Sequence, residues 1–481
     1  MAVTVQSPRT PHPPERKLTV ERKLPQGRDD CPRCAALEAR VAELEQLVAE
    51  LKDRLLANSS NSSTAPSSDP LWAPKPKPRK PSGKKPGGQQ GHQGHHRKLL
   101  PIEQVDEVVK HRPQNCAHCH LPLDDNSPSK LRHRHQVAEL PPRAVIVTEH
   151  QSYACTCDHC GNSTTGAIPK NIQKSVTGPR LTAALCYLSA YMHGSRRAIE
   201  EVATELLGCP LSLGTISNRE REMTDALESS YQQVQQHVRS APAKNVDETG
   251  WKRAGRWLWV AATRTCALFR IDRGRNWHGL QNLLGELVQG TVCSDRHGLY
   301  ERLKIQRRGI CWAHLKRDFQ RFIDRGGATL WLGEEGLLIT RDLFRLWHRF
   351  KAGRIKRPTL RRYIRLLRER MKDLLIRGYH CDVTKAKHFC RNLLKVFTGL
   401  WTFTKIDGIE PTNNHAERML RHAVIWRKKC FGSHSPAGCT YVGHMLTAIQ
   451  TLRLQNRSVL SFLTDTLKAH RTGLTAPNLT I

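Results

Sequence analysis

The residues best suited to chemistry are three acidic side chains in separate parts of the sequence. Asp247 lies in VDETGW, Asp295 in SDRHGLY and Glu417 in NNHAERMLR. Carboxylate oxygens are the ligands that Mg²⁺ or Mn²⁺ prefers, and two such ions about 3.5–4 Å apart can activate a water or a hydroxyl and stabilise a leaving oxygen. These acids therefore predict an all-oxygen metal site. For Glu417 the alternative is a surface ion pair with Arg421, worth about 0.2–0.5 kcal/mol.

Strands must bring the two aspartates together. We expect a strand to Asp247, strands at about 256–262 and 266–272, a helix at about 277–288, and a strand ending at Asp295. Three strands, a helix and a fourth strand is the order that opens a ribonuclease-H-like α/β fold, in which the first and fourth strands are neighbours. Both aspartates would then point into one site.

The residues around the acids refine this prediction. Consecutive side chains of a strand point to opposite faces, so we exclude Glu248 from the metal ligands. A helix is expected to begin near Asn414, with the paired asparagines as its cap and Glu417 in its first turn. A helical insertion is expected at about 325–405. Its charge would suit contact with DNA, and a purely structural role is the alternative.

Two cysteine pairs predict a second metal site. CAHC and CDHC flank a segment, HRHQVAELPPRAVIVTEHQSY, that we expect to form two strands around a Pro-Pro turn. Such pairs suit a tetrahedral zinc ribbon, although unliganded cysteines are an alternative. Cys155 could replace Cys157 as a ligand. The expected Zn²⁺ ligands are Cys116, Cys119, Cys157 and Cys160.

The charge of the chain indicates a polyanionic partner. The 77 Lys and Arg residues outnumber 43 Asp and Glu residues, giving a net charge of +34, and nucleic acid is the usual partner of so basic a protein. The most apolar run, at 181–192, is too short to span a membrane. No apolar signal-peptide core begins the sequence, so we expect a cytoplasmic, nucleoid-associated protein whose sixteen cysteines are metal ligands or core residues.

Residues 31–57 carry the heptad rhythm of a short self-association helix, for which a helix packed on the body of its own chain is the alternative. Residues 58–104 are rich in Ser, Pro, Gly and Lys, which is typical of a linker that either follows phosphates or only separates domains. Two helices around a turn near Gly208, the second capped by Ser212, predict a helix-turn-helix or an ordinary helical hairpin. The apolar heptad positions are Leu37, Val41, Leu44, Val48, Leu51 and Leu55.

The expected organisation is a tail (1–30), a coiled-coil helix (31–57), a basic linker (58–104), a zinc-binding domain (105–175), a helix-turn-helix-like region (176–240), a catalytic core (241–450) with a helical insertion, and a C-terminal helix and tail (451–481).

Several motifs occur together in the order found in one protein family. They are the leucine-patterned helix, the NSSNSS linker, the PSGKKPGGQQGHQGH stretch, VAELPP between two CxxC pairs, and then VDETGW, SDRHGLY, CWAHLKRDF and NNHAERMLR. Over nearly its whole length the sequence resembles TnpC-type transposases of the IS66 insertion-sequence family. The resemblance implies a DDE core with Asp247, Asp295 and Glu417 as its catalytic carboxylates. One departure is Arg296-His297, where a small Gly-Tyr-like pair is expected.

The resemblance implies a DNA transposase that binds the inverted-repeat ends of an element, cleaves their 3′ ends and joins them to target DNA. Expected partners are double-stranded DNA, further copies of the chain and accessory proteins of the same element, with no membrane. The alternative is a non-catalytic zinc and helix-turn-helix repressor derived from a transposase; a nuclease of structured RNA is a third reading. We expect His314 beside the active site without a catalytic role. The residues expected to contact DNA are Lys84, Lys85, Arg219, Lys316, Arg317, Arg418, Arg421, Lys428 and Lys429.

Overall fold

A computed structural model of the chain describes residues 32–62, 69, 99–124, 129–141, 144–160, 162–169, 172, 175–251 and 255–480. The chain divides into two compact units, and helix α1 (Pro32–Leu55) belongs to the first. The apolar heptad side chains of α1 are all between 45% and 61% exposed. Lys84 and Lys85, with most of the predicted linker, lie outside the described residues.

The second unit contains a five-stranded mixed sheet with the strand order β5-β4-β3-β6-β7. Strands β3, β4 and β5 pair antiparallel, whereas β6 is parallel to β3 and β7 is parallel to β6. The predicted succession of three strands, a helix and a fourth strand beside the first is confirmed. The elements are β3 (Ala243–Gly250), β4 (Arg256–Ala262), β5 (Ala267–Arg273), α6 (Trp277–Leu284), β6 (Thr291–Ser294) and β7 (Arg308–Ile310).

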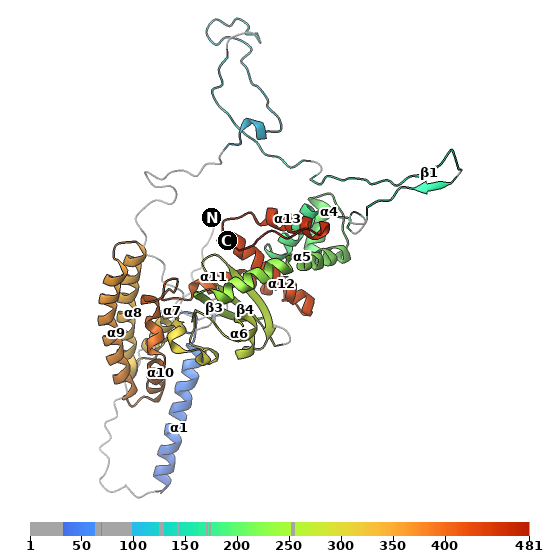
Figure 1. The fold of residues 1–481 in the computed structure, drawn as a ribbon. Coiled ribbons are helices and arrows are strands. Elements are labelled where there is room, and N and C mark those ends of the chain that lie inside the picture. Colours follow the sequence, from blue (N-terminus) through green and yellow to red (C-terminus); the bar gives the residue numbers. More distant parts are fainter. Residues whose placement is uncertain are drawn as a thin grey trace, which may run out of the picture. The chain divides into compact units, whose positions relative to one another are not determined.

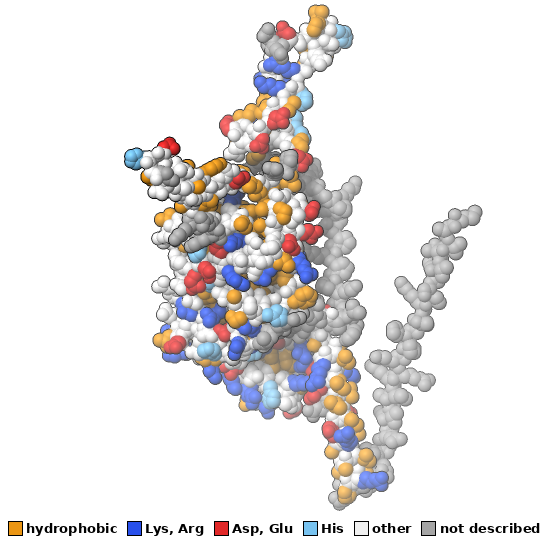
Figure 2. Space-filling view, turned by 90° about the vertical axis from the view of Figure 1, so that its right-hand side faces the viewer, with side chains coloured by type: hydrophobic (Ala, Val, Ile, Leu, Met, Phe, Trp, Pro, Cys, Tyr) orange, Lys and Arg blue, Asp and Glu red, His pale blue; other side chains and the backbone are white. Residues whose placement is uncertain are grey.

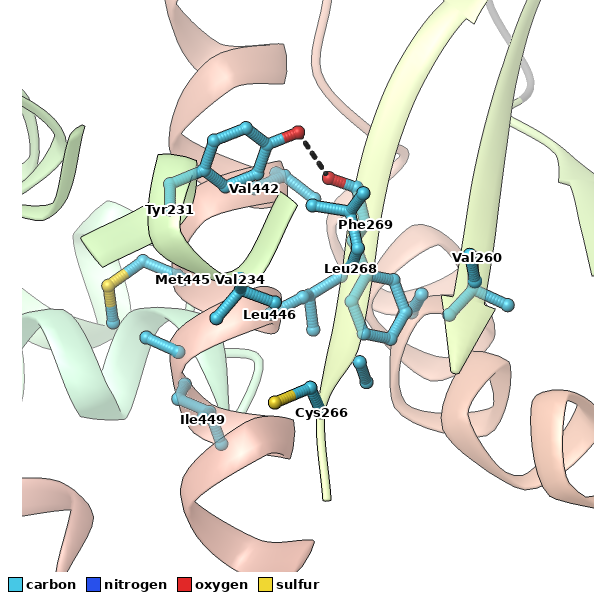
Figure 3. Packing of buried hydrophobic residues seen from close by; sticks show 14 of the residues in the cluster. Tyr231, Val234, Val260, Cys266, Leu268, Phe269, Val442, Met445, Leu446 and Ile449 are labelled. Carbon is cyan, nitrogen blue, oxygen red and sulfur yellow. Dashed lines mark hydrogen bonds between the residues drawn. The ribbon is translucent and has the colours of Figure 1, made fainter. Parts of the chain in front are cut away.

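Two long helices, α5 (Leu213–Ser240) and α12 (Pro436–Leu454), cover part of this sheet. Figure 3 shows apolar side chains of α12 packed against β5, with Tyr231 of α5 donating a hydrogen bond to the carbonyl of Phe269 at 3.0 Å. Along β5 the hydroxyls of Thr447 and Thr451 accept hydrogen bonds from the backbone N–H groups of Phe269 and Ala267. Helix α12 therefore covers an edge strand and also satisfies its free donors.

The predicted insertion is helical, and its apolar residues form a second hydrophobic cluster, which also includes Cys293 of β6 and Ile310 of β7. Figure 1 shows α8, α9 and α10 side by side in this region. Apolar residues recur at helical spacing on their inner faces, including Leu343, Met371 and Cys390, which are buried. Within the predicted bounds lie η5 (Gly327–Thr329), α8 (Leu330–Lys351), α9 (Arg357–Tyr379), α10 (Thr384–Lys395) and η6 (Phe397–Thr404), and helix α7 (Trp312–Arg325) directly precedes them.

Two further helices, α3 (Pro179–Ala190) and α4 (Arg196–Glu205), precede α5. Ser212 caps α5 as predicted, because its hydroxyl accepts a hydrogen bond from the N–H of Thr215 at 3.2 Å. The helix that follows the predicted turn is 28 residues long and reaches the sheet. Helix α5 therefore packs in the core around the sheet, in addition to any DNA-binding surface that its first turns form.

The cysteine-rich region differs from its prediction. It has one short hairpin, β1 (Ala154–Thr156) with β2 (Ser163–Thr165), which surrounds the second CxxC pair. The two strands expected around the Pro-Pro turn are absent from the described residues between 129 and 153. Ile146 is 95% exposed, so the alternating apolar residues of this segment have no packing surface, and strand propensity depends on such packing.

The surface is charged on the face drawn in Figure 2, where Lys and Arg side chains are interspersed with Asp and Glu. Among the described residues, no helix has both the length and the apolar character needed to cross a membrane.

The last two helices of the chain follow the insertion. Helix α11 (Asn414–Cys430) buries Ala416, Leu420 and Trp426 in the core that surrounds the sheet. The C-terminal helix α13 (Val459–Thr472) contributes Leu463 and Leu467 to the same core.

Candidate functional site

Three separate elements position the predicted acids. Asp247 lies in β3, Asp295 directly follows β6, and Glu417 is in the first turn of α11. The parallel register pairs Asn245 with Cys293, and the two aspartates lie two residues further along each strand. The two aspartates therefore lie at the same level on neighbouring strands, where β6 ends.

The electrostatics of Asp247 show that these acids interact. Burial is the main cause that raises the pKa of Asp247 well above its ordinary value, and the negative charges of Glu248, Asp295 and Glu417 raise it further. Like charges gathered in a partly desolvated site have this effect on a carboxyl group. The three predicted acids are thus near enough for their charges to act on one another, but among the described residues their oxygens do not form a group within 4.8 Å of one another.

Asn413 joins α11 to the strand that carries Asp247. Its side-chain oxygen accepts a hydrogen bond from the amide of Asn245 at 3.0 Å, and its own amide donates to the carbonyl of Val246 at 2.8 Å. The predicted side-chain cap on α11 is therefore wrong, because these polar atoms face β3 instead of the helix. This contact holds the first turn of α11, and with it Glu417, against β3.

Glu248 has partners of its own. Its carboxylate accepts hydrogen bonds from Arg275 at 2.6 Å and from the hydroxyl of Tyr300 at 2.5 Å, and burial raises its pKa. Arg275 also reaches Asp295 at 3.4 Å, so it lies between the two carboxylates. Sequence reasoning missed both partners: Tyr300 was within the SDRHGLY motif, whereas Arg275 lies in no motif.

The unexpected Arg296-His297 pair shapes the surroundings of Asp295. The backbone N–H of His297 donates to the carboxylate of Asp295 at 2.9 Å. Arg296 forms an ion pair with Asp318 of α7 and lies over the ring of Phe389, 5.3 Å from its centroid. The arginine therefore ties the loop after β6 to the helical insertion.

A second group of potential ligands adjoins the acids at the start of α7. The Nδ1 atom of His314 lies 4.0 Å from the Oε1 atom of Glu417, and neither atom has a hydrogen-bond partner among the described residues. His314 is thus beside the predicted active site, as expected. The Sγ atom of Cys311 completes a group whose ligand atoms all lie within 4.8 Å of one another. Cys311 was missed, although its CxxH spacing with His314 was the available signal.

The two CxxC pairs form turns of the same kind. The N–H of Cys116 donates to the carbonyl of Leu121 at 2.9 Å, and that of Cys157 to the carbonyl of Asn162 at 2.8 Å. In each turn, N–H groups of the following residues lower the pKa of the first thiol. Within the described part of the chain, however, the four cysteines do not meet in one group of ligand atoms.

Exposed basic residues follow one face of α11 from the acidic site outward. Successive members are three, seven and one residues apart, and at 3.6 residues per turn these positions fall on one side of a helix. Lys316 on α7 is exposed as well, and Arg317 is partly buried. The exposed basic residues of α11 are Arg418, Arg421, Lys428 and Lys429.

Arg219 has an ion-pair partner within its own helix. Its side chain is only 13% exposed and forms an ion pair with Glu222 at 2.7 Å. Glu222 is also paired at 2.7 Å with Arg471 of α13. Glu222, which pairs with both arginines, therefore joins α5 to the C-terminal helix, and the predicted DNA contact of Arg219 stays a prediction.

Comparisons with known proteins identify the family to which this chain is similar. The model of a family described as "Transposase IS66 family" matches residues 174–441, which is more than half of the chain and includes the sheet, the three acids and the insertion. A family of unknown function (DUF6444) matches residues 8–98. No curated protein matches the chain. On the evidence of the first match, the chain belongs to the IS66 family of transposases.

Proposed function

We propose that this protein is a DNA transposase that cleaves the 3′ ends of its element and transfers them to target DNA through a ribonuclease-H-like DDE core. The observation that carries the proposal is that the charges of Asp295, which follows β6, and of Glu417 on α11 both act on Asp247 of β3. The sheet supports it as well, because three antiparallel strands followed by two parallel ones put both aspartates at one edge.

The residues present suit divalent cations, whose use the DDE family implies. Three carboxylates in one environment carry more negative charge than Arg275 offsets, and the Oε1 atom of Glu417 has no hydrogen-bond partner among the described residues. Asp247, Asp295 and Glu417 would hold Mg²⁺ or Mn²⁺, which when bound activates a water or 3′-hydroxyl and stabilises the leaving oxygen. Ligands that are all oxygen favour hard cations of this kind.

The protein's own residues would orient this site and hold the DNA. Asn413 sets the position of Glu417, and Arg275 shields Glu248 from Asp295. The exposed basic face of α11 would bind phosphates that flank the reacting bond, because Arg and Lys contacts to phosphates position DNA without reading its sequence.

The cysteine turns are proposed to bind Zn²⁺ together. Cys157 is the better ligand candidate than Cys155, because only Cys157 heads a turn like that of Cys116, whereas Cys155 lies within β1 opposite Thr164. N–H groups that point at a sulfur stabilise its thiolate form, the form that binds a metal. Binding would draw Cys119 and Cys160 to the same ion.

The test is Mg²⁺-dependent cleavage of a labelled duplex that carries the element's own ends, with DNA binding measured in parallel. Glu417→Gln should lower the cleavage rate by at least about 100-fold. Replacing a residue that only hydrogen-bonds to a metal ligand typically costs about 10–100-fold, and loss of a ligand itself should cost more. The matched control is Glu410→Gln, since Glu410 precedes α11 and is paired with Lys351 at 2.8 Å. Equal cleavage by wild type and Glu417→Gln would refute the proposed site, and tight binding without cleavage by any variant would favour the repressor.

A further inference from the structure

Three different ligand atoms meet where α7 and α11 begin. The Sγ atom of Cys311, an imidazole nitrogen of His314 and a carboxylate oxygen of Glu417 all lie within 4.8 Å of one another. Two of the atoms that face each other, Nδ1 of His314 and Oε1 of Glu417, are buried without hydrogen-bond partners in the described part of the chain. Leaving buried polar atoms without partners is costly, and a bound ion placed between these two atoms would satisfy both.

The chemistry of these atoms selects a class of cation. Sulfur and imidazole nitrogen suit borderline-soft ions such as Zn²⁺ and Co²⁺, whereas Mg²⁺ prefers oxygen alone. A set of one sulfur, one nitrogen and one oxygen leaves a fourth tetrahedral position open for water. We propose that Cys311, His314 and Glu417 bind one Zn²⁺-like cation in a site that shares Glu417 with the three-carboxylate site.

The backbone around Cys311 is arranged for such a ligand. Cys311 is the N-cap residue of α7, and its sulfur accepts a hydrogen bond from the backbone N–H of Asn413 at 3.2 Å. The N–H of Trp312 donates to the carbonyl of Pro411 at 2.8 Å, which fastens the start of α7 to the segment before α11. The sulfur and the carboxylate are therefore positioned by two helix starts that are bonded together.

Binding exchanges a proton for the cation. Burial raises the pKa of the Cys311 thiol to about 11, so the thiol is protonated at neutral pH without a metal. The divalent cation would form a bond to sulfur while the thiol proton leaves to solvent, with no oxidant or reductant involved. N–H groups near the sulfur, which act to lower its pKa, stabilise the resulting thiolate.

Sharing of Glu417 has a functional consequence that rests on the proposed transposase activity. A Zn²⁺ ion held by Cys311 and His314 would draw Glu417 away from the two aspartates. Zn²⁺ and Mg²⁺ would then compete for one carboxylate, and Zn²⁺ would inhibit cleavage. Cation binding itself does not depend on that activity.

The first test is Co²⁺ binding by the full chain, followed by its absorption spectrum. Wild type should bind one more Co²⁺ per chain than Cys311→Ser, and the difference spectrum should show near-ultraviolet absorption from a bond between sulfur and cobalt. Serine at position 311 is itself a good N-cap residue. Co²⁺ bound by the two CxxC turns contributes equally to both proteins and therefore cancels in the difference spectrum. Cys390→Ser, at a buried cysteine of the insertion, is the matched control and should bind like wild type. His314→Ala should lower the affinity for the same Co²⁺ ion at least about tenfold. Identical stoichiometry and spectra for wild type, Cys311→Ser and His314→Ala would overturn the proposal.

The second test adds Zn²⁺ to the Mg²⁺-dependent cleavage reaction. Wild type should be inhibited at Zn²⁺ concentrations at least tenfold lower than Cys311→Ser requires. If Co²⁺ binds through Cys311 while no variant cleaves DNA, the cation site stands and the proposed function fails. If wild type cleaves DNA but binds no additional Co²⁺, the proposed function stands and the cation site fails.

Discussion

Asn413 precedes Glu417 by one helical turn, so whatever holds the asparagine also positions the acid. The N–H of Glu417 donates to the carbonyl of Asn413 at 3.2 Å, while the asparagine side chain is bonded to Asn245 and Val246 of β3. The sequence predicted the place of Glu417 in a first turn, but not the use of Asn413. An asparagine before a helix usually caps it, and only the contact with β3 decides otherwise.

Asn413→Ala should therefore lower both stability and cleavage. The substitution removes two buried hydrogen bonds and leaves Asn245 with an unpaired amide, at a cost of about 1–3 kcal/mol. Asn414→Ala is the matched control, because its side chain is exposed and surface substitutions usually change stability by less than about 0.5 kcal/mol. Thermal unfolding and Mg²⁺-dependent cleavage would be measured for both variants. Equal melting temperatures would contradict the assigned role of Asn413.

Asp247→Asn should stabilise the protein when divalent cations are removed with EDTA. Burial raises the pKa of Asp247 in the folded chain above 3.8, so the folded protein retains a proton that the unfolded chain releases as the pH rises. Asp247 therefore destabilises the fold increasingly from about pH 4 up to its folded pKa. The gain in melting temperature should be absent below pH 4 and grow to about 2 °C or more toward neutral pH. A gain independent of pH would contradict this account.

At the scale of elements, periodicity predicted the sheet well and the cysteine-rich segment poorly. Strand β4 has the predicted bounds and β5 begins one residue late; the apolar residues of both strands are buried in the core around the sheet, and those of β5 pack against α12. The apolar residues between 129 and 153 show a similar pattern but lack a surface to cover them in the described part of the chain. Pattern alone cannot tell these cases apart, since a strand needs a partner.

The packing of α7 on α8 depends on a residue without a side chain. A Cβ atom on Gly336 would overlap the ring of Phe319, so Gly336→Ala should destabilise the insertion by about 1–3 kcal/mol although alanine favours a helix. Gly214→Ala, in the first turn of α5, is the control with the opposite sign, because its Cβ would meet only ordinary contacts. Chemical denaturation would measure both. Stabilisation by Gly336→Ala would show that the helices are loosely packed.

At the scale of the whole molecule, the excess of basic residues could be predicted from composition, whereas their placement could not. On the face shown in Figure 2 they are mixed with acidic residues. The basic face of α11 is therefore distinguished by its position beside Glu417 and not by charge density. Arg219 is an example, because its type predicted a DNA contact but did not reveal that its side chain is only 13% exposed and paired with Glu222.

Arg421→Ala should weaken DNA binding and reduce its dependence on salt. If Arg421 contacts one phosphate, the slope of log K against log salt concentration should fall in magnitude by about 0.9. Lys468→Ala on α13 is the charge-matched control, since Lys468 is exposed and lies outside α11. Fluorescence anisotropy at several salt concentrations would measure both slopes. An unchanged slope for Arg421→Ala would remove α11 from the DNA-binding surface.

The exposed apolar stripe of α1 predicts self-association. Leu44→Glu with Leu51→Glu should lower the oligomeric state measured by light scattering, because charges at heptad core positions oppose pairing of helices. Glu45→Gln, on an exposed position of the same helix, should leave it unchanged. If the doubly substituted chain keeps the wild-type mass, α1 is not the assembly element.

Because α12 covers the edge strand β5, truncation of the chain before α12 should have a different effect from a point substitution. A frameshift or stop codon before residue 436 would delete α12, expose the apolar face of β5 and leave its edge donors unpaired. Such a truncated product would misfold and be degraded. Substitution of a single acid such as Glu417 would instead leave α12 in place and the face of β5 covered.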